Sequence, residues 1–423
     1  MYELIERLNA DPEARRRAGR RQALLLTLAT LTLAGCAPEP EPDASGPLAL
    51  AASDVSLLGT SDVIAMVRDL EVLPDGSVWI LNSVEPYFVG FGADGTVLAR
   101  HGTAGGGPRE FRMPAGLLEG GYEGEAWAFD YVRHAFIRVS EPDAWAQVDL
   151  PAEAIPRGSV RGGMSVMSPT VRTARLGGEL VVPWTAATME AGLPAYRSGI
   201  LLADFAAVDA RSGAARKVVS LREVLEDPYA DFVATDGGFP LWYRLWAVCG
   251  GYLRVHDRVR NQVRGFTATG EEVAPIPLPV PTLTSVTPEE FARAVFPLRQ
   301  AEVTGAVGPR LTAEDSVRLI QEMAQRLTGQ PHELAAYLPR YVDLRCSDEG
   351  VMWLQPIDLD AGGLQGSRTW LRIAGDGTAR QVAFPPGFDP HRFVGSRVWG
   401  VQRDELDVAS VAWIDLAGGG TTG

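Results

Sequence analysis

Cysteine and histidine are scarce in this chain of 423 residues, which contains three Cys and five His. The histidines, His101, His134, His256, His332 and His391, lack the spacing that is typical of a metal site. The chain also has no phosphate-binding loop, nucleophile elbow or metalloprotease helix motif. The sequence therefore predicts no metal site and no cofactor, and it identifies no catalytic residue.

Basic residues are also in deficit, since 39 Lys and Arg are set against 53 Asp and Glu, a formal net charge of −14. This balance argues against nucleic acid as a partner. The apolar run at residues 23–34 is too short to cross a bilayer, which takes about 20 residues. Gly and Pro are abundant by contrast, with 46 and 30 residues, as in chains with many turns.

The first residues have the pattern of an export signal. Arginines at positions 15–17, 20 and 21 precede the apolar run, which ends in Leu33-Ala34-Gly35-Cys36. This ending resembles the lipobox of bacterial lipoproteins, which implies that Cys36 is acylated and becomes the mature N-terminus. Ala37 after the cysteine implies, by the same resemblance, an anchor in the outer membrane facing the periplasm. The alternative is an ordinary secretory signal with a chance cysteine.

We divide the chain by composition. Residues 1–35 are the predicted signal peptide, and residues 36–47 are a flexible tether rich in Pro and Glu. Residues 48–417 form the folded domain, with a helical insertion at about 284–338, and residues 418–423 are a disordered tail.

The stretch from Ile64 to Pro114 indicates the fold. Asp75-Gly76 and Asp94-Gly95 each lie between short apolar runs, and Asp-Gly in this position is a strong hairpin signal. Two such turns about 19 residues apart give four antiparallel strands, which form one blade of a β-propeller. The pattern returns along the chain and predicts an all-β, six-bladed propeller, with seven blades as the alternative. The last blade lacks an outer strand, so we expect residues 54–58 to complete it.

A family resemblance supports this fold. Residues 75–95 resemble an NHL repeat, and residues 251–270 are similar to one. The Gly-rich link from His101 to Phe111, which ends at Pro114, resembles the connection between such blades. The chain also resembles bacterial lipoproteins known only as six-bladed β-propellers. These have no common activity, so the resemblance implies a fold but no function.

The long connections are predicted to lie on one face of the propeller. If the strands of a blade are named A to D from the inside outward, the B–C loops and the D–A crossovers emerge on the same face. Every long connection belongs to one of these two kinds, while the A–B and C–D turns are short. Because function is often carried by loops on a rigid scaffold, we expect this face to be the functional one. The long connections are residues 102–113, 150–170, 185–199, 222–243, 279–340 and 356–367.

The largest connection is predicted to contain helices. Thr287-Pro288-Glu289-Glu290 has the pattern of an N-cap with a capping box, and Thr312 begins a second helix. The apolar faces of these helices need a partner surface. They form either a lid over the channel mouth or a patch packed on the rim.

Polar residues recur where the B–C loops begin. One interpretation is a polar ring at the channel mouth that binds an anionic or mixed-charge ligand. The other is that these side chains cap their own loops. The candidate residues are Asn82, Asp130, Arg133, His134, Asp257, Arg258, Arg260, Asn261 and Gln355.

Cys249 and Cys346 each follow the first strand of what we take to be neighbouring blades. An exported protein can form a disulfide. Equivalent points on adjacent blades are often more than about 7 Å apart, so we favour two free, buried thiols.

Two functions follow from these patterns. The first is a lipid-anchored binding or scaffold propeller that presents its long-loop face to a protein, peptide or glycan partner in the cell envelope. The second rests on resemblance, because related propellers include lactonases and lyases that hold a metal at the channel centre. This second hypothesis is a hydrolase or lyase with a metal at the channel mouth. Ca²⁺ or Zn²⁺ is expected as a cofactor only under this hypothesis.

Overall fold

The computed structural model describes residues 47–150, 172–184, 204–220, 224, 245–279, 286–296, 312–326, 340–359 and 365–417, except 61, 63, 65, 108, 131, 142, 144, 145 and 295. The predicted signal peptide with Cys36, nearly all of the tether and the predicted tail lie outside these residues. What the sequence indicates about them stays a prediction.

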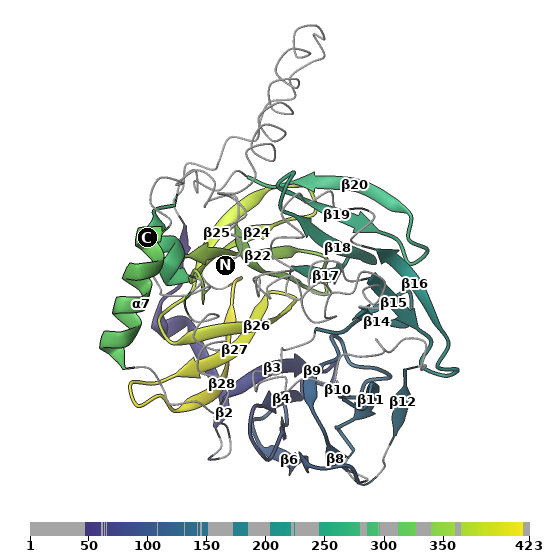
Figure 1. Ribbon diagram of the computed structural model, residues 1–423. Coiled ribbons are helices and arrows are strands. Elements are labelled where there is room, and N and C mark those ends of the chain that lie inside the picture. The colour runs from purple at the N-terminus through teal and green to yellow at the C-terminus, as the bar shows by residue number, and fades with distance from the viewer. Residues whose placement is uncertain are drawn as a thin grey trace, which may run out of the picture.

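Six sheets of mainly antiparallel strands are arranged in a ring (Figure 1). This arrangement confirms the six-bladed propeller, and the alternative of seven blades is wrong. From the inside outward, blade 1 is β3 (Val67–Val72), β4 (Val78–Asn82), β5 (Phe88–Phe91) and β6 (Val97–His101). Blade 2 is β9 (Pro114–Leu117), β10 (Trp127–Asp130), β11 (Ala135–Arg138) and β12 (Gln147–Asp149). Blade 3 is β13 (Ala174–Leu176), β14 (Glu179–Trp184), β15 (Asp204–Val208) and β16 (Ala215–Ser220).

The second half of the ring follows the same plan. Blade 4 is β17 (Trp246–Cys249), β18 (Tyr252–Asp257), β19 (Gln262–Phe266) and β20 (Glu272–Pro277). Blade 5 is β21 (Tyr341–Cys346), β22 (Met352–Asp358), β24 (Thr369–Ile373) and β25 (Ala379–Ala383), with β23 (Gln365–Gly366) paired to β22. Blade 6 is β26 (Phe388–Val394), β27 (Arg397–Arg403), β28 (Ala409–Asp415) and β2 (Val55–Thr60).

The N-terminal segment closes the ring, as predicted. Strand β2 pairs antiparallel with β28, from Val55 opposite Ile414 to Thr60 opposite Ser410. An additional strand, β1 (Leu48–Ala49), pairs parallel with β25 at the outer edge of blade 5 and is followed by the short helix η1 (Ala52–Asp54). We did not predict β1. Leu50 explains its position, because this side chain is buried against the core of blades 5 and 6.

The core lies between neighbouring blades. Successive side chains of a strand point to opposite faces of the sheet, so each strand packs against the blades on both sides of its own. In β4, Trp79 and Leu81 pack toward blade 2, while Val78 and Ile80 pack against Trp399 in blade 6. The residues from Val78 to Leu81 are therefore apolar on both faces of β4 and are all buried.

The predicted Asp-Gly turns are present. Gly95 has a φ of 83°, and a Cβ at this position would lie 2.0 Å from the carbonyl oxygen of Leu58 in β2. Glycine is therefore required here both for the turn and for the close approach of the N-terminal strand. One A–B connection is longer than we predicted, since residues 118–126 join β9 to β10.

The Gly-rich link after blade 1 contains a short parallel pair of strands, β7 (Thr103–Ala104) and β8 (Glu110–Phe111). The insertion after blade 4 contains helices, as predicted. Residues 288–294 are helical, and α7 (Ala313–Arg326) follows. Thr287 and Glu290 form the capping box, in which the backbone N–H of Glu290 donates to Thr287 Oγ1 at 3.1 Å.

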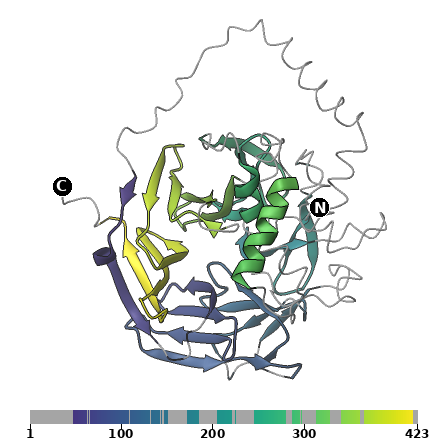
Figure 2. The same cartoon turned by 60° about the vertical axis from the view of Figure 1, so that its left-hand side comes forward.

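Figure 1 shows α7 outside the ring of sheets, and Figure 2 shows it in front of the ring. The first helix is well packed, since Phe291 and Phe296 are buried. On α7, Leu319 and Met323 are half-buried and Val317 is exposed. Both arrangements of the helices, as a lid over the channel mouth or as a patch packed on the rim, stay predictions.

Candidate functional site

Charged side chains from five of the six blades meet in the interior of the ring, and we call them the central charged cluster. They come from the innermost strands or from residues directly beside them. Its members are Asp69 and Glu71 on β3, Glu119 after β9, Arg172 before β13, Asp343 and Arg345 on β21, and Arg392 on β26.

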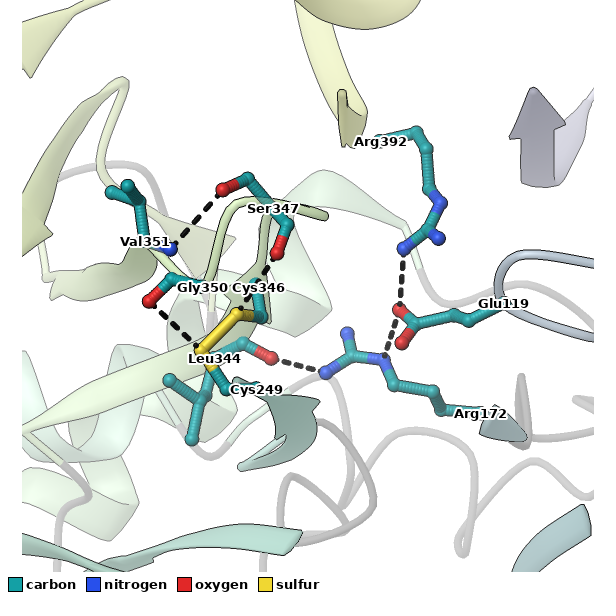
Figure 3. The surroundings of a disulfide bond; sticks show 9 residues. All are labelled: Glu119, Arg172, Cys249, Leu344, Cys346, Ser347, Gly350, Val351 and Arg392. Atoms are coloured by element: carbon teal, nitrogen blue, oxygen red, sulfur yellow. Dashed lines mark hydrogen bonds and ion pairs between the residues drawn. A yellow bond between two sulfur atoms is a disulfide. The ribbon is translucent and has the colours of Figure 1, made fainter. Parts of the chain in front are cut away.

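The members form a chain of ion pairs, part of which is drawn in Figure 3. Arg392 Nε lies 3.1 Å from Glu71 Oε2, and its Nη1 lies 3.3 Å from Glu119 Oε1. Arg172 Nε lies 3.8 Å from the same Glu119 oxygen, and its Nη2 lies 2.6 Å from Asp343 Oδ1. Arg345 then pairs with Asp343 at 3.1 Å. The chain of charges thus runs through blades 6, 1, 2, 3 and 5.

Hydrogen bonds to the backbone extend this network. Arg172 Nη1 donates to the carbonyl oxygen of Trp246 at 2.6 Å and also to that of Leu344, so one arginine joins blades 3, 4 and 5. Asp69 Oδ2 accepts the backbone N–H of Leu117 at 2.8 Å. Because buried charges are costly unless they are paired and hydrogen-bonded, these contacts are what makes the cluster tolerable.

The protonation of Glu71 is sensitive to this environment. Burial raises the pKa of Glu71 to about 7, although Arg392 opposes the shift and Glu119 adds to it. Burial lowers the pKa of Arg172, with Arg345 adding to the effect. For Arg392, burial is outweighed by the carboxylates of Glu71 and Glu119, which raise its pKa. Glu71 can therefore gain or lose a proton near neutral pH.

Cys249 and Cys346 form a disulfide, with their Cα atoms 5.4 Å apart (Figure 3). Our prediction of two free thiols is wrong. Both cysteines end an innermost strand, where adjacent blades come closest, and the separation is within the range that a disulfide can bridge. The bridge joins blades 4 and 5, between which the helical insertion lies in the sequence.

The structure places the predicted residues Asp130 and Asp257 as loop caps. Asp130 is buried, and its carboxylate accepts the backbone N–H of Arg112 at 2.7 Å and that of Arg133 at 3.0 Å. Asp257 is also buried and accepts the backbone N–H groups of Val259 and Arg260, both at 3.1 Å. These contacts fix the B–C loops of blades 2 and 4.

The same two loops have matching backbones. His134 and Asn261, each four residues after the capping aspartate, have positive φ values of 52° and 49°. Arg133 Nη2 donates to the carbonyl oxygen of Gly107 at 2.7 Å, which joins its loop to the Gly-rich crossover. Arg260 Nη1 donates to Asp257 Oδ2 at 3.2 Å.

The side chains of three further candidates donate hydrogen bonds to backbone carbonyl oxygens. Asn82 is buried and donates from Nδ2 to the carbonyl oxygen of Pro86 at 3.1 Å. Asn261 Nδ2 donates to the carbonyl oxygen of Leu278 at 3.0 Å, and Gln355 Nε2 to that of Ser367 at 3.1 Å. Arg258 is half-buried in the loop after Asp257. The contact of Asn82 agrees with the capping interpretation, whereas Asn261 joins its loop to the crossover after β20, and Gln355 lies within β22 and not at a loop start. A role in ligand binding stays a prediction.

Sequence reasoning missed the central charged cluster. The signal was the alternation of charged and apolar residues in inner strands, as in Asp69-Leu70-Glu71 and Asp343-Leu344-Arg345. Among the described residues, no three His, Cys, Asp or Glu side chains are grouped so as to hold a metal ion. Within the same part of the chain, no helix is long and apolar enough to cross a membrane.

No protein-family model matches the chain, and no curated protein is significantly similar to it. Solved structures do resemble it. Virginiamycin B lyase from Staphylococcus aureus has 11% identity and a TM-score of 0.38, with 86% of this chain and 88% of that chain covered. A luciferin-regenerating enzyme has 10% identity and a TM-score of 0.40, with 85% and 94% covered. YCF48 bound to the D1 peptide has 10% identity and a TM-score of 0.35, with 87% and 82% covered. At this level of identity, the likeness concerns the fold alone.

Proposed function

We propose that the protein is a lipid-anchored binding propeller of the cell envelope that presents its B–C loops and D–A crossovers to a protein or peptide partner. The observation that carries this proposal is the capping of these loops. The buried carboxylates of Asp130 and Asp257 hold two of them in matching conformations. Loops fixed before binding lose little conformational entropy when a partner docks, which favours a binding surface.

The interior of the ring supports the same proposal. The central charged cluster links five blades, and the disulfide links the fourth to the fifth. A ring joined in this way is a rigid support for surface loops. A buried disulfide is also typical of proteins from oxidising compartments, in agreement with an exported protein.

An enzyme is the second candidate, in the form of a propeller hydrolase or lyase with a metal at the channel mouth. One observation favours catalysis, because Glu71, with its pKa of about 7, could transfer a proton at neutral pH. However, Glu71 is buried and paired with Arg392, so we prefer the binding function.

Site-specific photo-crosslinking tests the proposed face. We would place the crosslinker at Val84 and Val259, exposed residues in the B–C loops of blades 1 and 4. Matched controls at Asp94 and Asp376 lie in C–D turns on the opposite face. We expect a discrete adduct in living cells from the first pair alone. Protease and glycosidase digestion of the adduct then separates a protein or peptide partner from a glycan. Equal adducts from both faces would contradict the proposal.

A further inference from the structure

The imidazole of His256 is buried without a hydrogen-bond partner among the described residues. It lies on β18 directly before the B–C loop of blade 4, and its side chain is 4% exposed. In the part of the chain that the structure describes, neither Nδ1 nor Nε2 has a hydrogen-bond partner. Buried polar groups are nearly always hydrogen-bonded. A buried imidazole without a hydrogen-bond partner therefore suggests that a ligand supplies one.

His256 lies at the base of the helical insertion, where the chain leaves blade 4 and enters blade 5. Its ring packs edge-on against Tyr341, with centroids 5.3 Å apart and an interplanar angle of 88°. Tyr341 Oη donates to the carbonyl oxygen of Pro279 at 3.3 Å, so the chain leaves blade 4 and enters blade 5 beside this histidine. Both strands, β18 and β21, belong to the neighbouring blades 4 and 5.

The charged neighbours of His256 are mainly cationic. They are Arg258 from its own loop, Arg340 directly before Tyr341, and Asp257. The Asp257 carboxylate accepts the N–H groups of its own loop and is therefore already engaged. Arg340 is half-exposed, and among the described residues no carboxylate or carbonyl group is paired with its guanidinium.

The imidazole is uncharged at neutral pH. Burial lowers the pKa of His256 to about 4; Asp257 opposes this shift, and Arg258 and Arg340 add to it. A neutral imidazole offers one N–H donor and one acceptor. A guanidinium offers a planar set of donors that matches carboxylate and phosphate oxygens.

We propose that His256 and Arg340 form a binding site for the carboxylate or phosphate group of a ligand, with Tyr341 positioning the imidazole at the base of the insertion. This site specifies the ligand group for the proposed binding function and rests on that proposal. It lies at the end of β18 from which a B–C loop of the proposed face emerges. An oxyanion there would accept hydrogen bonds from both side chains and would compensate the positive charge of Arg340.

NMR of ¹³C-labelled histidine tests this site directly. The protein is the mature chain, residues 36–423, carrying Cys36→Ser, and the His256→Gln variant identifies the His256 resonance. The pKa of His256 is measured in sodium chloride, in acetate and in phosphate at equal ionic strength. We expect a saturable rise of about one unit or more in at least one oxyanion, because a bound anion stabilises the imidazolium. A rise of the pKa in acetate but not in phosphate would identify a carboxylate site, and a rise in phosphate but not in acetate would identify a phosphate site.

Arg340→Gln should abolish the rise, whereas Arg380→Gln, at an exposed position on β25 of blade 5, should preserve it. The same pKa in all three salts, or a rise that persists in Arg340→Gln, would overturn the proposed site. The crosslinking experiment separates the two proposals. A face-specific adduct without any oxyanion effect would leave the binding function standing and remove only the anion site.

Discussion

Glu71 in the first blade and Arg392 in the last blade are joined at 3.1 Å, although 321 residues separate them in the sequence. The ring is therefore closed twice. On the outside, β2, from which the chain continues into blade 1, pairs with β28 within blade 6, and on the inside, an ion pair connects the innermost strands of blades 1 and 6.

The pH dependence of stability should depend on Glu71. Its pKa is about 7 in the folded state, against 4.5 as the ordinary value. The folded state therefore binds more protons than the unfolded state between these values. The resulting stabilisation is complete below about pH 4.5 and is lost as the pH rises to about 7.

Urea unfolding from pH 5 to pH 8 measures this effect. We expect a decrease in the free energy of unfolding of up to about 3 kcal/mol from this group. Glu71→Gln should flatten the profile, while Glu405→Gln, at an exposed position, should leave it unchanged. A profile that keeps its slope in Glu71→Gln would assign the dependence to other groups.

Arg172 should be among the most sensitive positions for stability. Replacing it with Met removes its ion pairs with Asp343 at 2.6 Å and Glu119 at 3.8 Å, while Arg345 stays beside the buried carboxylate of Asp343 at 3.1 Å. We expect a loss of roughly 3 kcal/mol, the lower end for a broken buried ion pair, since Arg345 still compensates part of this charge. The control is Arg216→Met. Arg216 pairs with Glu179 at a partly exposed site, so this variant should lose about 1 kcal/mol or less of the free energy of unfolding. Chemical denaturation of both variants checks the contrast, and similar losses would refute it.

The disulfide should stabilise the whole domain. It closes a loop with a sequence separation of 97 residues, for which chain-entropy estimates give about 4–5 kcal/mol. The double variant Cys249→Ser, Cys346→Ser should therefore melt at a lower temperature than the wild type. The wild type measured in a strong reductant serves as the control and should melt with the double variant. A melting temperature unaffected by either treatment would contradict a stabilising role.

Cys36 should determine where the protein is found in the cell. If it is acylated, Cys36→Ser abolishes incorporation of a clickable fatty acid and moves the protein from the membrane fraction to the soluble periplasmic fraction. Cys249→Ser provides a matched loss of a cysteine and should keep the label. Labelling that persists in Cys36→Ser would exclude the predicted lipobox.

The features that could be predicted from the sequence are those with a local signal. Asp94-Gly95 indicates its turn within four residues, and Thr287 with Glu290 indicates a helix start over the same distance. Residues 54–58 could be assigned to the last blade because a ring must pair its edges.

The features that could not be predicted depend on the dimensions of the ring. Arg172 contacts Asp343 across 171 residues, and neither has a local pattern that identifies the other. The distance between Cys249 and Cys346 depends on how closely adjacent inner strands approach. Asp130 and Asp257 were identified as loop starts, but only the structure shows that their carboxylates are buried. We accordingly expect charge reversal at either position to reduce stability as well as any binding.

The disulfide has a consequence for the integrity of the chain. Cys249 and Cys346 lie on either side of the helical insertion, so a single cut anywhere between them leaves the two fragments covalently joined. Under non-reducing conditions a nicked molecule would migrate as one species, and the propeller would keep both halves of its ring. The insertion can thus be cleaved without releasing blades 5 and 6 from blades 1 to 4.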